Sequence, residues 1–135
     1  MKNFQSESTT SGKLFEERVE QHLIDKGYTI VSTNTKIDGI GVNVDYIAKK
    51  NNIIEYGEAK GGESGGKKRP GAQRTDNVKK AICNGALLKA KYPNAKYVIY
   101  FSAKPKAGNS SDEMIQTAIK VGYVDEVRYL DSPDP

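Results

Sequence analysis

The sequence predicts an α/β domain in which helices flank a mixed central sheet, with the elements in the order αβββαβαβ. Apolar residues recur at helical spacing in three segments, and short runs of β-branched and aromatic residues alternate with them. Most of the predicted connections between helices and strands contain glycine, proline or asparagine, residues that favour turns. We expect one domain over residues 11–135, because 135 residues suffice for a single modest core.

The first helix is predicted to begin near Ser11 or Gly12 and to end at Gly27. Its inward stripe is formed by Leu14, Phe15, Val19, Leu23 and, less squarely, Ile24. Residues 1–10 are polar, and we expect them to be a disordered leader.

Two antiparallel strands are predicted next, after a first strand over residues 28–33. Residues 42–60 read as a β-hairpin with the two-residue loop Asn51-Asn52, because asparagine tolerates positive φ better than most residues. This loop sets the register by pairing Lys50 with Ile53.

The same register places two acidic residues directly opposite each other, Asp45 and Glu58. Strand side chains alternate, so Lys60 projects from the same face as Glu58. Two negative charges on directly opposed strand residues repel each other, so the pair is unfavourable unless a proton or a cation lies between them. With a lysine beside the pair, a divalent metal ion is the favoured explanation.

Helices and strands alternate in the rest of the chain. We expect a helix over 72–92, a buried strand over 97–102, a helix over 110–122 and an edge strand over 125–130. The inward stripe of the first of these helices is predicted to contain Val78, Ile82 and Ala86, with Leu88 beside it. Ser110 and Glu113 have the spacing of a capping box.

Asp45 on one strand and Glu58-Ala59-Lys60 on the next resemble the active-site pattern of the PD-(D/E)XK nucleases. The proline that usually precedes the aspartate is replaced by Val44. Within this superfamily the chain is most similar to archaeal Holliday-junction resolvases, whose first helix carries a glycine and, four residues on, a glutamate. Gly12 and Glu16 have that spacing. The resemblance runs from about Gly12 to Lys60 and implies a restriction-endonuclease-like fold.

Metal-dependent hydrolysis of phosphodiester bonds is the activity that this resemblance implies. Asp45, Glu58 and the carbonyl oxygen of Ala59 would hold Mg²⁺ or Mn²⁺, hard cations that prefer oxygen ligands. Lys60 would orient the attacking water or stabilise charge on the phosphate, or act as the base if its pKa is depressed. Spacing alone favours a solvated helix acid for Glu16, but the resemblance gives equal weight to Glu16 as a third active-site acid.

The segment after Lys60, GGESGGKKRPGAQR, is too rich in glycine and basic residues to pack a core. It reads either as a solvated loop or, given its position next to the acidic pair, as a phosphate-binding loop. The residues expected to contact nucleic acid are Lys67, Lys68, Arg69, Gln73, Arg74 and Lys80.

Composition limits the remaining possibilities. The net charge of +4 and the pI near 9.0 mildly favour a polyanionic partner. With 36% hydrophobic residues and no apolar run near the roughly 20 residues of a membrane span, we expect a soluble protein without a membrane partner. The single cysteine, Cys83, excludes an internal disulfide and is expected to be buried on its helix.

The substrate stays open at this point, with DNA as the primary expectation. Nucleases of this fold cut duplex DNA, branched DNA or, in some toxins, transfer RNA. A junction resolvase would need a homodimer, and a toxin module would need an immunity protein that covers its basic cleft. The location would be cytoplasmic, or a target cytoplasm for a delivered toxin. A non-catalytic nucleic-acid-binding module is the third alternative, against which the intact Asp45, Glu58 and Lys60 argue.

Overall fold

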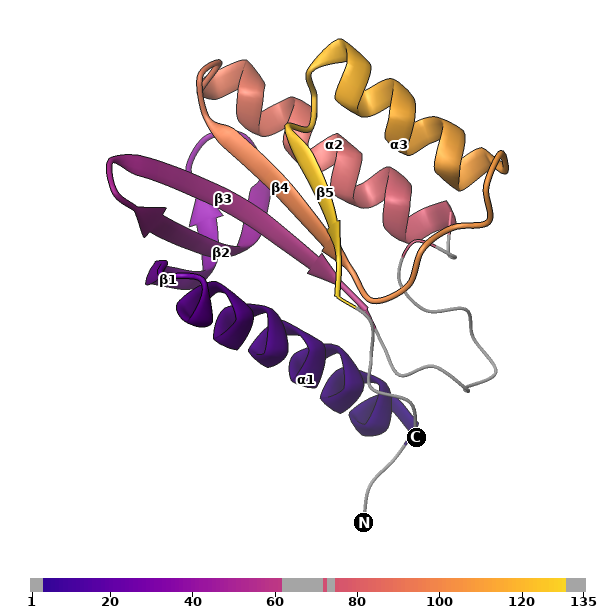
Figure 1. Ribbon diagram of the computed structural model, residues 1–135, viewed down its shortest axis with the longest axis horizontal. Coiled ribbons are helices and arrows are strands. Elements are labelled where there is room, and N and C mark those ends of the chain that lie inside the picture. The colour runs from indigo at the N-terminus through magenta and orange to yellow at the C-terminus, as the bar shows by residue number, and fades with distance from the viewer. Residues whose placement is uncertain (1–3, 62–71, 73–74, 131–135) are drawn as a thin grey trace.

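Five strands form one mixed sheet, and three helices cover its two faces (Figure 1). The computed structural model describes residues 4–61, 72 and 75–130, with side chains from Gly12 onward. The elements are α1 (Phe4–Asp25), β1 (Thr29–Ile37), β2 (Val42–Lys50), β3 (Ile53–Lys60), α2 (Thr75–Lys91), β4 (Lys96–Phe101), α3 (Ser110–Val121) and β5 (Glu126–Tyr129). The predicted class and the order αβββαβαβ are confirmed.

The strands lie in the sheet in their chain order, β1-β2-β3-β4-β5. β1, β2 and β3 are antiparallel neighbours, whereas β3, β4 and β5 run parallel and are connected through α2 and α3. Two successive crossovers of the usual right hand put both helices on one face of the sheet. α1 lies on the opposite face (Figure 1). The carboxyl ends of the three parallel strands therefore meet at one edge.

The hairpin between β2 and β3 has the register that its sequence predicts. Lys50 pairs with Ile53, and the ladder continues to Tyr46 opposite Gly57. Asn51 adopts the positive φ that the short loop requires, at 57°.

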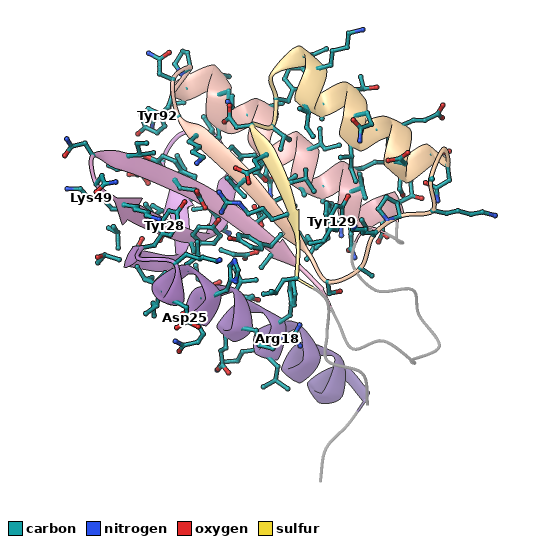
Figure 2. The ribbon with its side chains drawn as sticks, in the orientation of Figure 1. Arg18, Asp25, Tyr28, Lys49, Tyr92 and Tyr129 are labelled. Atoms are coloured by element: carbon teal, nitrogen blue, oxygen red, sulfur yellow. The ribbon has the colours of Figure 1, made fainter. Side chains whose placement is uncertain are left out.

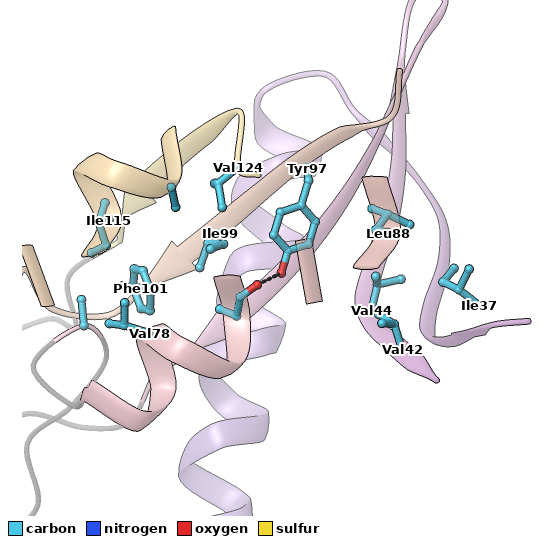
Figure 3. Packing of buried hydrophobic residues seen from close by; sticks show 13 residues of the cluster. Ile37, Val42, Val44, Val78, Leu88, Tyr97, Ile99, Phe101, Ile115 and Val124 are labelled. Atoms are coloured by element: carbon cyan, nitrogen blue, oxygen red, sulfur yellow. Dashed lines mark hydrogen bonds between the residues drawn. The ribbon is translucent and has the colours of Figure 1, made fainter. Parts of the chain in front are cut away.

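Two apolar clusters form the core, one on each face of the sheet. The cluster beneath α2 and α3 contains Val78, Leu88, Tyr97, Ile99 and Phe101, and the Tyr97 hydroxyl donates to the carbonyl of Ala81 at 2.6 Å (Figure 3). The cluster beneath α1 contains Phe15, Val19, Leu23, Tyr46, Ala48, Ala59, Val98 and Tyr100. β4 supplies alternate residues to both clusters, as expected of a fully buried central strand.

α1 differs from its prediction at its start and in its stripe. It begins at Phe4, so the predicted disorder of residues 1–10 is wrong for residues 4–10, which contain no glycine or proline to stop a helix. Leu14 and Ile24 are 46% and 51% exposed, because the sheet contacts only a narrow stripe of the helix.

The inward face of α2 also differs from the prediction. Val78 and Leu88 are buried as expected, but Ala81 and Gly85 are buried where Ile82 and Ala86 were predicted. Small residues face Tyr97 because its ring leaves no room for larger ones; a Cβ on Gly85 would lie 2.6 Å from that ring. Cys83 is exposed, contrary to the prediction.

The cap of α3 is one residue earlier than predicted. The Asn109 side chain accepts a hydrogen bond from the backbone N–H of Asp112, so Asn109 takes the capping role assigned to Ser110. Among the described residues, no helix has the length and apolarity needed to cross a membrane.

Candidate functional site

The acidic pair predicted from the hairpin comes together at the carboxyl end of β3. The Asp45 carboxylate accepts a hydrogen bond from the backbone N–H of Ala59 at 2.7 Å, which places it beside the next residue of the chain, Glu58. The negative charge of Asp45 also acts on the carboxyl group of Glu58 and raises its pKa. Asp45 is partly buried, and Glu58 is only 1% exposed. A backbone hydrogen bond thus holds Asp45 next to Glu58.

Two further side chains contact Glu58 directly. The amide nitrogen of Asn84, on α2, donates to Glu58 Oε1 at 2.7 Å. The Lys60 ammonium lies 3.9 Å from Glu58 Oε2, on the face predicted from strand alternation. Lys60 keeps 27% of its side chain exposed, so its charge remains accessible from solvent.

The environment of Glu58 disfavours its ionised form. Burial and, to a lesser extent, the negative charge of Asp45 raise its pKa to about 8, against the opposing effects of Lys60 and Asn84. Near neutral pH a proton on Glu58 is therefore favoured unless a cation takes its place. This is the behaviour expected of a carboxylate pair built around a cation.

Glu16 approaches the same pair from α1. Burial raises its pKa to about 7, helped by the charges of Asp45 and Glu20 and opposed by those of Lys60 and Lys13. The charges of Asp45 and Lys60 both act on Glu16, whose partly buried side chain lies on the helix that packs against the sheet. The structure thus brings together Glu16, Asp45, Glu58 and Lys60 from three different elements.

The side chains of the site supply only some of the ligands that a hard cation needs. Within the described residues, no three carboxylate, histidine or cysteine side chains converge tightly enough to hold a metal ion alone. Asp45 and Glu58 supply two carboxylates, and backbone carbonyl oxygen such as that of Ala59 is the usual complement for Mg²⁺, which also retains several waters. The pair therefore suits an ion that needs few protein ligands.

Close packing between β2 and β3, next to the acidic pair, holds these two strands in register. The Tyr46 ring lies across Gly57, where a Cβ would be 2.0 Å from the ring. On β2, Val42 and Val44 pack toward α2, whereas Tyr46 and Ala48 pack toward α1. The buried side of β2 thus changes from one helix layer to the other at Asp45, which leaves its carboxylate at the junction between them.

The basic segment starts and ends at this same edge of the sheet. Gly61 packs against Phe15 and Ser102, and the backbone N–H of Ala72 donates to the carbonyl of Ala103 at 3.1 Å. The predicted phosphate contacts Lys67, Lys68, Arg69, Gln73 and Arg74 lie outside the described residues. Lys80 is exposed on α2, and it is Asn84, one turn further along, that reaches Glu58.

Asn84 is the residue of the site that sequence reasoning missed. Its signal is weak: an amide one position before Gly85, on the side of α2 that packs on the sheet. A polar residue on an inward helix face needs a buried partner, and Glu58 is that partner. The buried pair of Glu55 and Arg128, described below, was also missed.

The comparisons with known proteins find a likeness among the solved structures. No family model matches the chain, and no curated protein matches it. Among solved structures, SfsA of Pyrococcus furiosus, determined in complex with Ca²⁺, matches with a TM-score of 0.53 and 19% sequence identity over 90% of this chain. The match covers 55% of the SfsA chain, so this chain spans about half the length of that protein. At this identity the likeness establishes the fold.

Proposed function

We propose that this chain is a metal-dependent nuclease of the PD-(D/E)XK type that hydrolyses phosphodiester bonds in DNA. The observation that carries the proposal is that Asp45 is held beside the buried Glu58 by the backbone N–H of Ala59, with the Lys60 ammonium 3.9 Å from Glu58. A structural salt bridge would need only one acid and one base. The site has two acids, which repel each other, and a bound cation would remove that repulsion.

Asp45 and Glu58, with the carbonyl oxygen of Ala59, would hold Mg²⁺ or Mn²⁺. When bound, such an ion activates a water and stabilises charge on the phosphate. The SfsA structure was determined with Ca²⁺, another hard cation that takes oxygen ligands, which is in keeping with this proposal.

The other side chains have roles that follow from their positions. Asn84 fixes the orientation of Glu58 by donating to Oε1, and leaves Oε2 directed toward Lys60. Lys60 stabilises the negative charge that develops on the phosphate. Glu16, with its pKa raised to about 7, is able to hold or release a proton next to Asp45 and Lys60 near neutral pH.

Cleavage assays test this proposal. The protein is incubated with plasmid DNA, a four-way DNA junction and total transfer RNA, in Mg²⁺ or in EDTA. We expect Mg²⁺-dependent cleavage of DNA, and a loss of about 10²–10⁴-fold in rate for Lys60→Ala. Asp45→Asn should be inactive as well. The matched control is Lys49→Ala, which removes an exposed lysine from β2 and should keep full activity.

Each outcome assigns a different function. Cleavage that survives EDTA would overturn the metal mechanism, and DNA binding without cleavage would indicate the non-catalytic module. Cleavage of transfer RNA alone would favour the toxin-type alternative and its immunity partner. Symmetric cutting of the four-way junction would favour a homodimeric resolvase.

A further inference from the structure

A cavity lies on the α1 face, toward the hairpin end of the sheet. Its volume is about 210 Å³, and it is lined by His22, Lys26, Tyr28, Lys50, Tyr100 and Arg128. Tyr28 and Lys49, the neighbour of Lys50, lie at the hairpin end in Figure 2, away from the end where β3 finishes. Lys50 and Lys60 are at opposite ends of the hairpin, so this cavity is separate from the site around Glu58.

The cavity is lined by three cationic side chains and by no acid. Two carboxylates fix the position of Arg128, because its guanidinium donates to the buried Glu55 at 3.0 Å and to Glu126 at 2.7 Å. Glu55 is 0% exposed and also accepts from the Tyr46 hydroxyl at 2.5 Å. These bonds fix the guanidinium at the wall of the cavity.

Two exposed lysines, Lys26 and Lys50, line the cavity. Neither Lys26 nor Lys50 forms an ion pair with any residue that the structure describes. Lys50 instead lies over the Tyr28 ring, 5.3 Å from its centroid. Glu55 and Glu126 offset the charge of Arg128, but the two ammonium groups that line the same cavity repel each other, and an anion between them relieves that repulsion.

Tyr100 adds a hydrogen-bond donor that has no acceptor. Its hydroxyl oxygen accepts from Arg128 at 2.8 Å, and no acceptor for its own proton is present among the described residues. His22 packs edge-on against the same ring, with centroids 5.8 Å apart. The wall of the cavity thus offers hydroxyl, imidazole and ammonium donors, whereas all five N–H groups of Arg128 are bonded to Glu55, Glu126 and Tyr100.

We propose that this cavity binds a phosphate group. Phosphate accepts several hydrogen bonds and carries the charge that the two lysines require, and a volume of about 210 Å³ holds it with a few waters, since each water occupies about 30 Å³. The proposal does not rest on the proposed nuclease activity. The phosphate comes either from a small molecule or from the backbone of a nucleic acid.

The single histidine of the chain makes the test direct, because His22 lines the cavity. The imidazole resonances are followed by NMR at constant pH while inorganic phosphate is added, and a parallel titration uses NaCl at equal ionic strength. We expect a saturable shift with phosphate that NaCl does not reproduce. Equal shifts in the two titrations would overturn the proposal.

Variants locate the binding. Lys26→Ala combined with Lys50→Ala should weaken phosphate binding at least tenfold, whereas Lys106→Ala combined with Lys120→Ala, which removes exposed lysines elsewhere, should leave it unchanged. Equal weakening in both double variants would reduce the effect to net charge and would contradict the site. All four lysines are exposed, so both proteins should fold, which circular dichroism checks.

The source of the phosphate is resolved by repeating the titration with a nucleoside monophosphate and with a short DNA oligonucleotide. Tighter binding of the monophosphate that is lost in the Lys26 and Lys50 variant identifies a small molecule. Tighter binding of the oligonucleotide that is lost in that variant identifies the nucleic-acid backbone, whether or not the protein cleaves it. Titrations are run in EDTA, so a failure of the metal site leaves this result intact.

Discussion

At the residue scale, the properties of the site depend on where Glu58 is buried. A glutamate has a pKa near 4.5 when unperturbed, and at this position burial and Asp45 raise its pKa to about 8. Asn84 and Lys60 reduce this effect without abolishing it. A group that prefers to be neutral costs stability once it is forced to ionise, which is a cost that a bound cation removes.

The first prediction concerns stability against pH without metal. Because the pKa of Glu58 is higher in the folded state, the folded protein binds more protons than the unfolded chain between pH 4.5 and about 8, and the free energy of unfolding falls as pH rises through this range. Glu58→Gln should be more stable than the original protein at pH 8.5, by on the order of a few kcal/mol.

Urea unfolding in EDTA at pH 5.5, 7 and 8.5 measures this difference. Part of the fall in stability should persist in Glu58→Gln, because the pKa of Glu16 is also raised, to about 7. An unchanged slope of stability against pH in Glu58→Gln would show that Glu58 is ionised in the folded protein.

At the element scale, close packing between Tyr46 and Gly57 fixes the two strands of the β2–β3 hairpin against each other. The Tyr46 ring occupies the space above Gly57, and its hydroxyl is anchored on Glu55 at 2.5 Å. The ring is therefore not free to move aside. The hairpin loop sets the register, and this contact allows only a residue without a side chain at position 57.

The second prediction is that Gly57→Ala destabilises the protein. The added Cβ would lie 2.0–2.4 Å from atoms of the Tyr46 ring, and overpacking of this kind costs about 1–3 kcal/mol or more. Gly12→Ala is the control, because nothing lies within 4 Å of its Cβ position and alanine favours the helix by about 0.5–1 kcal/mol. Denaturant unfolding measures both; equal stability of the two variants would contradict the packing described here.

At the scale of the whole molecule, charge is distributed unevenly around the sheet. The two ends of the segment from Gly61 to Ala72 are anchored at the edge that carries Asp45 and Glu58, and this segment contains Lys67, Lys68 and Arg69. If the proposed function is right, we expect these basic residues to contact the phosphates of the nucleic acid.

The third prediction is that replacing Lys67, Lys68 and Arg69 together by alanine weakens DNA binding and flattens its salt dependence. Each lost phosphate contact reduces the slope of log affinity against log salt by about 0.9 on duplex DNA. Fluorescence anisotropy at several salt concentrations gives the slope. The control replaces Lys104, Lys106 and Lys120, which changes the net charge equally; the same slope in both variants would exclude the loop from the interface.

Local signals were sufficient for much of the fold. Residue alternation and the Asn51-Asn52 loop depend only on neighbours in the chain, and the strands and hairpin register follow from them. Helix faces were harder to predict, because apolarity does not reveal which residues meet the sheet. Ile24 is exposed, whereas Gly85 is buried against Tyr97.

The site residues, like the fold, could be predicted from the sequence only in part. The sequence by itself determined that Asp45, Glu58 and Lys60 come from adjacent strands at one end of a hairpin, because strand periodicity and a two-residue loop permit few registers. Only the tertiary structure decided that Asn84 reaches Glu58, that Glu16 approaches the pair, and that Arg128 lines a separate basic cavity. These residues are brought together by helix packing and by parallel strand crossovers, which depend on the shape of the whole core and leave no local pattern in the chain.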